Sequence, residues 1–277
     1  MQDFDVVVIG GGIGGMIAAN YLVSLGVKTA VVEQNHQTGG SMSGFRRGDF
    51  YFDGGDQSFE SLGIVFPLLE ELDIYSHIQW IPCRYRMKSP DFDFFIDSFD
   101  HVEEALQSAF PREKGIRPLF QEIREVSRFL ETHCTPWEFP LIQDFSVGKL
   151  LGLLPYLPRL RRWLTYRYRE KACSAIRDPQ LRNWLTRIGY YRMPYIFFAG
   201  FWHLWAKDYW YPKGGMQAFH DLLASRFRGE GGTILLNTRI VRIVSEGRQA
   251  VAVETAEGER ISAGRFIYGG DYKRLAG

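Results

Sequence analysis

A run of four apolar residues at positions 6–9 leads directly into a glycine-rich stretch at positions 10–15. The apolar run predicts a buried strand, and Gly10, Gly12 and Gly15 follow the pattern Gly-x-Gly-x-x-Gly. In this pattern the first glycine permits a tight turn. The second lets the backbone approach a pyrophosphate, and the third lets a helix pack closely on the strand. The stretch therefore predicts a dinucleotide site at the N-terminus of a helix.

The residues that follow complete a strand, turn, helix and strand. Small and apolar residues at 16–25 predict a helix, Gly26 predicts its end, and residues 28–32 predict a second strand. Glu33 ends that strand about 20 residues after the glycines, where an acid accepts hydrogen bonds from a ribose. Its charge would repel a 2′-phosphate, so a nucleotide of the FAD or NAD kind is expected rather than NADP. The alternative is an ordinary turn of a parallel sheet with Glu33 merely solvated.

Composition narrows the class of protein further. The chain has 277 residues, enough for one large or two small cores, and its 33 basic and 32 acidic side chains give no sign of nucleic-acid binding. Cys83, Cys134 and Cys173 lack metal-ligand spacing and are interpreted as free thiols of a reducing compartment. Because the first predicted strand begins at Phe4, no signal peptide is expected, and we expect a cytoplasmic protein without a metal site.

Two further glycine pairs follow the ribose acid. Gly39-Gly40-Ser41 comes shortly after Glu33, and Gly54-Gly55 follows an apolar strand predicted at 50–52. Glycine pairs let the backbone run close along a bound cofactor because they carry no side chains. Without the first motif they would indicate only the turns of a hairpin.

These segments resemble the N-terminal pattern of the FAD-dependent phytoene desaturase, carotenoid isomerase and retinol saturase group, a branch of the amine-oxidase-like flavoproteins. The matching stretches are Gly10 to Gly15, Glu33, Gly39-Gly40, Phe52-Asp53-x-Gly55 and Tyr211-Pro212-Lys213-Gly214-Gly215-Met216. Many members of the wider group have arginine after the glycine pair, whereas Ser41 is more similar to the isomerase and saturase branch.

The resemblance implies an FAD cofactor and a long apolar isoprenoid substrate of the carotenoid or polyene type. In the family, an aliphatic residue at the position of Ile240 meets the adenine through its backbone, and a small-residue turn at the position of Gly269-Gly270-Asp271 returns toward the flavin. The residues expected to bind FAD are Gly10, Gly12, Ile13, Gly14, Gly15, Glu33, Gly39, Gly40, Ser41, Gly54, Gly55, Ile240, Gly270 and Asp271.

The character of the chain changes between positions 61 and 211. Helices are predicted at 64–72, 102–110 and 116–134, and two strands around a turn at 85–96. The predicted fold class is α/β. A discontinuous, Rossmann-like FAD-binding domain at 1–60 plus 212–277 carries an inserted α+β domain at 61–211, which faces the substrate and the membrane.

A basic, leucine-rich segment at 147–172 lies within this insertion. It holds seven basic residues against one acid, Glu170, in a chain whose total charge is +1. Basic residues mixed with Leu and Trp suit a peripheral helix on an anionic membrane surface, although a solvated basic face of an ordinary packed helix is equally compatible. Pro155 and Pro158 are expected to prevent one continuous helix.

Aromatic residues concentrate at 189–211 and either form core or line a pocket for a flat, apolar ligand. The resemblance favours the pocket. Because a flavin carries the difficult chemistry, no side-chain nucleophile is required, and no catalytic residue is predicted. Of the six histidines, only His203 and His220 flank the aromatic and glycine segments and merit a test.

The leading hypothesis is an FAD-dependent oxidoreductase or isomerase acting on a long apolar isoprenoid. Family members continue beyond the matched part, so a C-terminal half on a longer or second chain is expected to complete the site. One alternative is a flavin amine oxidase or protoporphyrinogen oxidase, which usually lacks the basic insertion followed by Pro-Lys-Gly-Gly-Met. Another is a non-catalytic prenyl or lipid binder similar to the Rab GDP dissociation inhibitors, against which the intact glycine motif and Glu33 argue.

Overall fold

The computed structural model describes residues 3–55, 58–61, 65–133 and 151–271. The chain divides into two compact units. Unit 1 comprises Met1–Ser58, Leu68–Ile81 and Tyr211–Gly277, and unit 2 comprises Phe59–Pro67 and Pro82–Trp210. Each unit contains its own hydrophobic core.

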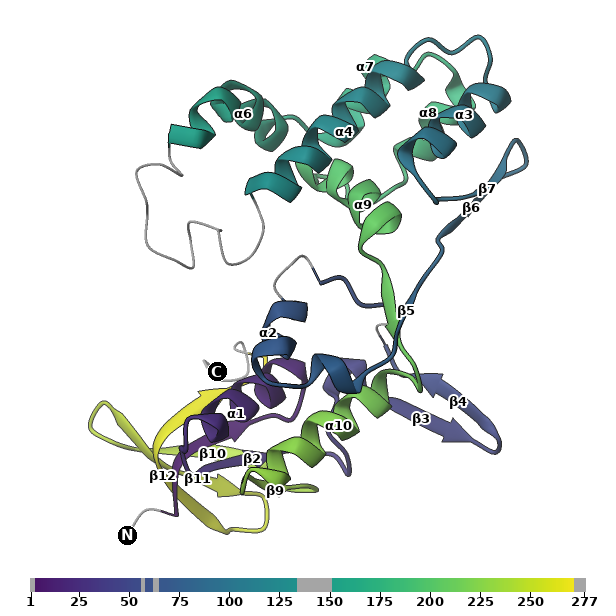
Figure 1. Cartoon of the computed structure of the whole chain (residues 1–277). Helices are drawn as coiled ribbons and strands as arrows, with labels where there is room; N and C mark the ends of the chain where they lie inside the picture. The colour runs from purple at the N-terminus through teal and green to yellow at the C-terminus, as the bar shows by residue number, and fades with distance from the viewer. Residues whose placement is uncertain (1–2, 56–57, 62–64, 134–150, 272–277) are drawn as a thin grey trace. The chain divides into compact units, whose positions relative to one another are not determined.

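Unit 1 is built on a six-stranded sheet with the order β10-β11-β12-β1-β2-β9 (Figure 1). Strands β12, β1, β2 and β9 run parallel, whereas β10, β11 and β12 form an antiparallel meander. The elements are β1 Phe4–Ile9, α1 Ile13–Ser24, β2 Thr29–Val32, η1 Gly40–Met42, β3 Gly44–Arg47, β4 Phe50–Asp53, α10 Met216–Gly229, β9 Thr233–Leu235, β10 Ile240–Glu246, β11 Gln249–Thr255 and β12 Arg260–Tyr268.

The centre of this sheet joins the two ends of the chain. Residues 6–9 of β1 are all buried because β1 lies between β2 on one side and β12 on the other. Val7 pairs with Ala30 of β2 and with Phe266 of β12. A strand enclosed in this way needs apolar residues on both faces, as residues 6–9 provide. The predicted α/β class with a discontinuous Rossmann-like domain is thereby confirmed.

Helices α1 and α10 lie side by side against the sheet (Figure 1). Asn20, which is fully buried in α1, donates from Nδ2 to the carbonyl oxygen of Leu223 in α10 at 3.1 Å. The apolar face of α10 is buried, with Met216, Phe219 and Phe227 each at most 1% exposed. A buried polar side chain that bonds a backbone carbonyl also fixes the register of the two helices.

One segment of the predicted insertion belongs to unit 1 instead. Residues 68–81, which include the end of α2 (Val65–Glu71), η2 (Tyr75–His77) and the start of β5 (Trp80–Pro82), cluster with the nucleotide-binding elements. The reason is packing, since Leu69, Leu72 and Ile74 are almost completely buried. Trp80 also packs against Phe219 of α10, with ring centroids 6.1 Å apart.

Unit 2 is mainly helical. Its elements are β6 Arg86–Lys88, β7 Asp93–Phe95, α3 Phe99–Ala109, α4 Ile116–His133, η4 Leu154–Tyr156, α6 Leu157–Thr165, α7 Tyr168–Ala175, α8 Pro179–Leu185 and α9 Tyr195–Lys207, while β8 Trp210–Pro212 starts at its boundary. The predicted pair of short strands and the two amphipathic helices after it are present. As expected, the segment with Pro155 and Pro158 is not one continuous helix, because η4, α6 and α7 follow one another as separate elements. Pro158 lies in the first turn of α6, a position where proline needs no backbone N–H.

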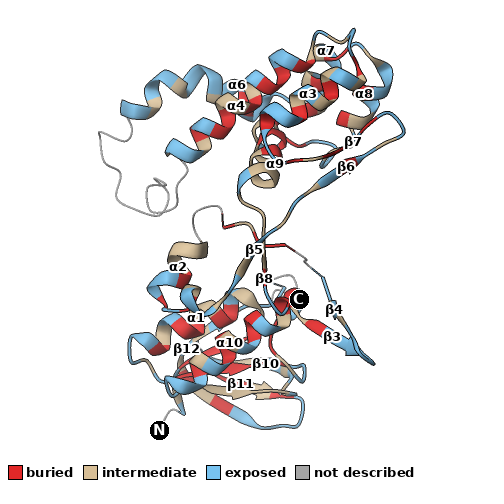
Figure 2. Cartoon of the chain, turned by 45° about the vertical axis from the view of Figure 1, so that its right-hand side comes forward, coloured by how far each residue is buried: buried red, intermediate tan, exposed pale blue. Residues whose placement is uncertain are grey.

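The aromatic stretch at 189–211 contributes mostly to the core of unit 2. On α9, Tyr195, Phe198 and Trp202 are buried, and Figure 2 shows that α3, α4 and α9 carry many of the buried positions of this unit. Phe120 of α4 meets Trp202 edge to face, with ring centroids 5.3 Å apart. The core interpretation therefore describes this face of α9, whereas Phe197 on the other side is exposed.

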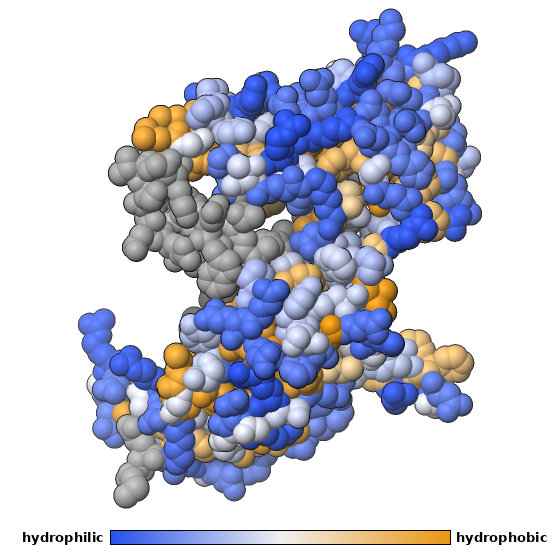
Figure 3. Space-filling model, in the orientation of Figure 1, coloured by the Kyte–Doolittle hydropathy of each residue, from blue (hydrophilic) through white to orange (hydrophobic). Residues whose placement is uncertain are grey.

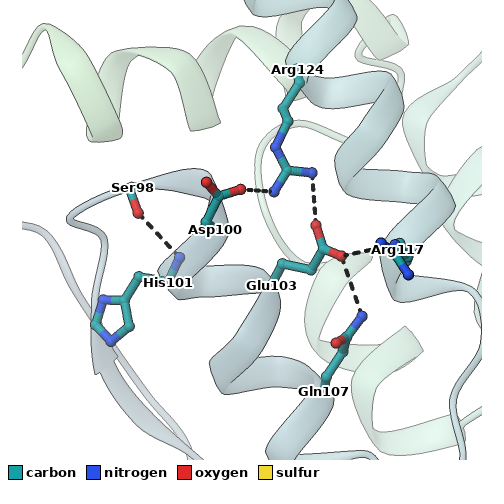
Figure 4. A network of polar contacts seen from close by, with 7 residues as sticks. All are labelled: Ser98, Asp100, His101, Glu103, Gln107, Arg117 and Arg124. Atoms are coloured by element: carbon teal, nitrogen blue, oxygen red, sulfur yellow. Dashed lines mark hydrogen bonds and ion pairs between the residues drawn. The ribbon is translucent and has the colours of Figure 1, made fainter.

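A charged network joins α3 to α4 (Figure 4). Arg124 donates to Glu103 at 2.7 Å and also to Asp100, while Glu103 accepts from Gln107 one turn later. Ser98 caps α3 by accepting from the backbone N–H of His101. These bonds align the two helices at the solvent side of the apolar core.

The structure bears on membrane-spanning helices and on the cysteines. Within the described ranges, no helix combines the length and hydrophobicity needed to cross a bilayer. Neither Cys83 nor Cys173 forms a disulfide within the described residues, and Cys134 lies outside them.

Candidate functional site

A cleft of about 810 Å³ opens in unit 1 beside the glycine motif. Its walls come from the ends of β1, β2 and β12 and from β10. The lining residues are Ile9, Gly10, Val32, Glu33, Gln34, Thr238, Arg239, Ile240, Val241, Arg242, Ile243, Ser245, Tyr268, Gly270 and Asp271. Since β1, β2 and β12 are parallel, their carboxyl ends meet at one edge of the sheet, which is where open α/β sheets bind ligands.

Five of the predicted site residues line this cleft although they are distant in sequence. They are Gly10, Glu33, Ile240, Gly270 and Asp271. The turn after β12 reaches the glycine motif through a hydrogen bond from Gly269 N–H to the carbonyl oxygen of Ile9, at 2.8 Å. Parallel pairing of β1 with β12 produces this juxtaposition, because both strands end at the same edge.

Glu33 is held rigidly at the end of β2. Its Oε2 accepts from the backbone N–H of Gly11 at 2.7 Å, and its Oε1 accepts from the backbone and side-chain nitrogens of Asn35 at 2.9 and 2.7 Å. Glu33 is only 5% exposed, so the alternative of a merely solvated acid is wrong. Because a carboxylate offers about four lone-pair sites, capacity remains to accept from a ribose hydroxyl.

The other glycine segments assemble around the first motif. Gly39 N–H donates to the carbonyl oxygen of Gly11 at 2.8 Å, and Gly12 and Gly39 form a parallel bridge. Gly54 N–H in turn donates to the carbonyl oxygen of Ser43 at 2.7 Å. Nine of the predicted residues are not among those that line the cleft. They are Gly12, Ile13, Gly14, Gly15, Gly39, Gly40, Ser41, Gly54 and Gly55.

The glycines at 12 and 15 meet different requirements. A Cβ at Gly15 would collide with the carbonyl oxygen of Gly10, so the fold itself needs glycine there. A Cβ at Gly12 would meet nothing nearer than the Cα of Gly40 at 4.0 Å, and the φ of Gly12 is −71°, which any residue adopts. Within the described residues, the protein gives no reason for a glycine at position 12. The open space above it, at the N-terminus of α1, fits a phosphate group that approaches the backbone.

Two arginines of the cleft were not predicted. Arg239 and Arg242 flank Ile240, and a β-bulge between Ile240 and Arg242 interrupts the regular pairing with β11. A bulge redirects neighbouring side chains, which explains why consecutive residues of β10 face the cleft. Arg242 pairs with Glu254 at 2.8 Å. The sequence could have indicated them, because Arg239 and Arg242 lie close to Ile240, the position expected to meet the adenine.

Asp53 connects two of the motif segments. Its carboxylate accepts from the hydroxyl of Tyr211 at 2.5 Å, from that of Tyr51 at 2.9 Å and from the backbone N–H of Met216 at 3.1 Å. The Asp53 side chain therefore caps the N-terminus of α10, where a negative charge is favourable. Burial raises the pKa of Tyr51, and the nearby Asp53 raises it further, so this hydroxyl stays a donor.

The two histidines selected for testing do not line the cleft. His203 in unit 2 has its Nδ1 2.8 Å from the hydroxyl of Ser127, and burial lowers its pKa. His220 is fully buried in α10. In the part of the chain that the structure covers, no cluster of three or more His, Cys, Asp or Glu residues could hold a metal ion.

Known proteins share both the sequence pattern and the fold. The family model of the flavin containing amine oxidoreductases matches residues 13–276. A 4,4'-diaponeurosporene oxygenase of Staphylococcus aureus (strain MRSA252) is 26% identical over 279 residues, which is 95% of this chain and 54% of that protein. The chain thus spans about half the length of the curated relatives it matches.

Solved structures show the same fold at low sequence identity. Putrescine oxidase bound to putrescine matches with a TM-score of 0.63 and 18% identity, over 99% of this chain and 60% of that one. A fatty acid isomerase from P. acnes matches with a TM-score of 0.60 and 12% identity, over 100% of this chain and 61% of that one. A Rab GDI from Plasmodium falciparum gives a TM-score of 0.59 and 13% identity, over 98% of this chain and 66% of that one.

Proposed function

The chain belongs to the flavin containing amine oxidoreductase family, and on this basis we propose that it forms the cofactor-binding part of an FAD-dependent oxidoreductase acting on a long apolar isoprenoid. The observation that carries the proposal is the cleft at the carboxyl ends of β1, β2 and β12. A bound flavin supplies the electron and hydride transfer of such a reaction. The relatives named for 4,4'-diaponeurosporene support the substrate class.

The residues around the cleft fit this cofactor. Backbone amides at the start of α1, with the open space above Gly12, would hold the pyrophosphate. Glu33 would accept from the adenosine ribose, and the backbone of Ile240 would meet the adenine. Gly39 and Gly40 contact the motif at Gly11 and Gly12, and Gly54 and Gly55 lie against Ser43 and Ser41. We propose that this backbone runs along the cofactor and that Gly270 with Asp271 lies toward the flavin.

Two partners belong to the same proposal. Because the chain spans 54% of its curated relative, we propose that a C-terminal half on a longer or second chain completes the substrate site. We also propose peripheral membrane contact through the basic segment 147–172, of which positions 147–150 lie outside the described residues. Both partners suit an apolar substrate, which partitions into lipid rather than water.

The test is retention of flavin by the purified chain. FAD is added, unbound cofactor is removed by gel filtration, and flavin absorbance is followed across the protein peak. Yellow protein is expected. Colourless protein, both from this chain and from a version extended to the length of the relatives, would overturn the proposal and favour a scaffold without redox chemistry, such as a lipid binder.

A matched pair of glycine substitutions sharpens this test. Gly12→Ala adds a methyl group to the space assigned to the phosphates and is expected to weaken FAD binding about tenfold or more, with the thermal stability of the cofactor-free chain unchanged. Gly229→Ala is the control, because a Cβ there meets nothing within 4 Å and the position lies at the far end of α10. Equal affinities of the two variants would contradict the assigned phosphate position.

A further inference from the structure

The helical stretch from Leu151 to Thr165 carries apolar residues that pack against the core and others that remain exposed. On the inner side, Leu153, Tyr156 and Leu160 pack against the core of unit 2, and Trp163 is buried within it. On the outer side, four leucines are between 48% and 58% exposed. We name them the outer leucine face: Leu151, Leu154, Leu157 and Leu164.

An ordinary surface helix has one apolar face, toward the core. Here the apolar surface is wider than the core covers: Leu157 and Leu164 follow the inner Leu153 and Leu160 by four residues and lie beside them, yet are about half exposed. Arg161 lies between Leu157 and Leu164 in the sequence. Figure 2 shows this stretch largely exposed, and Figure 3 shows an orange patch over its start, at the upper left. Exposed leucines that recur at helical spacing mark an interaction surface more clearly than isolated ones do.

The charged residues of the helical stretch itself are basic, and acids meet them from α4 and from Glu170, which lies 3.9 Å from Arg167. Residues 151–169 contain five arginines and no acid. Arg162 pairs with Glu122 of α4 at 2.9 Å, and Arg159 stands 4.0 Å from Glu125. Arg161, on the outer side, has no ion pair within the described ranges and is exposed. The outer leucine face is thus bordered by positive charge that α4 neutralises only in part.

We propose that the outer leucine face, with Arg161 among its leucines, docks onto an anionic lipid surface. Leucine side chains would enter the boundary between headgroups and acyl chains, while the long arginine side chains keep their charged ends at the phosphates. This inference rests on the proposed function in one respect: a substrate dissolved in lipid would give the chain a reason to bind a membrane. It narrows the membrane contact to one side of one helical stretch.

The same charges argue against a second copy of the chain as the occupant. A two-fold contact places the same patch on both partners, so the arginines of one copy would approach those of the other. Such like-charge contacts are unfavourable at an interface. Anionic lipid headgroups instead complement both the arginines and the leucines.

The experiment is sedimentation of the purified chain with vesicles. Binding is expected to vesicles of mixed phosphatidylcholine and phosphatidylglycerol, to weaken as salt concentration rises, and to be nearly absent with phosphatidylcholine alone. Leu154→Gln combined with Leu157→Gln is expected to reduce partitioning about tenfold or more, and Arg161→Glu about tenfold. Neither leucine belongs to the core, so both variants should remain folded.

Matched controls lie elsewhere on the surface. Leu25→Gln changes an exposed leucine of unit 1, and Arg187→Glu makes the same charge change at an exposed arginine of unit 2. Both controls are expected to bind vesicles as the unchanged chain does. Equal binding by the double leucine variant and the unchanged chain would overturn the proposal, as would failure of the unchanged chain to bind anionic vesicles.

Two other outcomes distinguish a contact between copies of the chain from lipid binding, and lipid binding from flavin binding. Self-association of the unchanged chain, abolished by the double leucine variant without any vesicle binding, would assign the face to a contact between copies and overturn the lipid proposal. Flavin absorbance is recorded on the same samples. Vesicle binding by a chain that retains no flavin would leave the lipid surface standing and count against the proposed function alone.

Discussion

His220 lies fully buried on α10, and neither of its ring nitrogens has a hydrogen-bond partner within the described part of the chain. Phe219 is its aromatic neighbour, with ring centroids 5.5 Å apart. Burial lowers the pKa of His220 to about 4, and the nearby Asp221 opposes this shift only weakly. The imidazole is therefore neutral in the folded chain at neutral pH.

This histidine predicts a loss of stability in mild acid. Because the folded pKa is about 4 and the unfolded value about 6.5, the unfolded chain takes up the proton first as the pH falls. The contribution of His220 to stability is complete above about pH 6.5, decreases between pH 6.5 and 4, and amounts to roughly 3 kcal/mol. Urea unfolding at a series of pH values measures it.

The variants separate this effect from other titrating groups. His220→Leu is expected to flatten the dependence between pH 6.5 and 4, whereas the exposed His36→Asn should leave it unchanged. A His220→Leu chain with the same acid sensitivity as the unchanged chain would show that other groups cause it.

Among the secondary-structure elements, the hairpin β3–β4 and helix α10 depend on one carboxylate. Asp53 at the end of β4 bonds Tyr51 within the hairpin, and it bonds Tyr211 and the first N–H of α10. Gln217 in the first turn of α10 adds a bond from its backbone N–H to the Tyr51 hydroxyl at 3.0 Å. Segments more than 150 residues apart in the chain are joined through these groups.

Removing this carboxylate should loosen the helix start. Asp53→Ala is expected to lower the free energy of unfolding by about 2 to 3 kcal/mol, since it leaves three partly buried donors without this acceptor, and Tyr211→Phe by about 1 kcal/mol. In a double-mutant cycle the two changes should couple by about 1 kcal/mol, because they remove one shared bond. Asp49→Ala in the exposed turn of the same hairpin is the control, and strictly additive effects would exclude the bond.

Each of the two compact units has a hydrophobic core, and among the described residues the core cluster of unit 1 adjoins the proposed cofactor site. FAD at a hundred times its Kd stabilises the state that binds it by about 2.7 kcal/mol, which slows exchange through opening of that state about 100-fold. We expect slower hydrogen exchange in β1, β2 and the start of α1. The core amides of α4 and α9 serve as the internal reference. Protection confined to α4 and α9 would place the ligand elsewhere.

Local pattern was sufficient for much of the fold. The apolar run at 6–9, the glycines after it and Glu33 predict a strand, a turn and a ligand edge, because burial on both faces and backbone freedom depend on nearby residues. The amphipathic spacing of 116–134 similarly predicts α4. The wider assignment to a family came from several such motifs in order along the chain.

Tertiary structure alone decided which distant groups meet. Nothing local to Trp80 or Leu72 indicates that residues 68–81 pack with α10 in unit 1, because burial against a distant helix depends on the whole fold. In the sequence, Asp53 is only one residue of a glycine-containing motif. The structure shows that it accepts hydrogen bonds from Tyr211 and Met216. The sequence by itself determined the strands, helices and glycine turns. The tertiary structure decided how these elements form one cleft. β1 pairs with β12 and α1 packs against α10, and both contacts join residues from opposite ends of the chain.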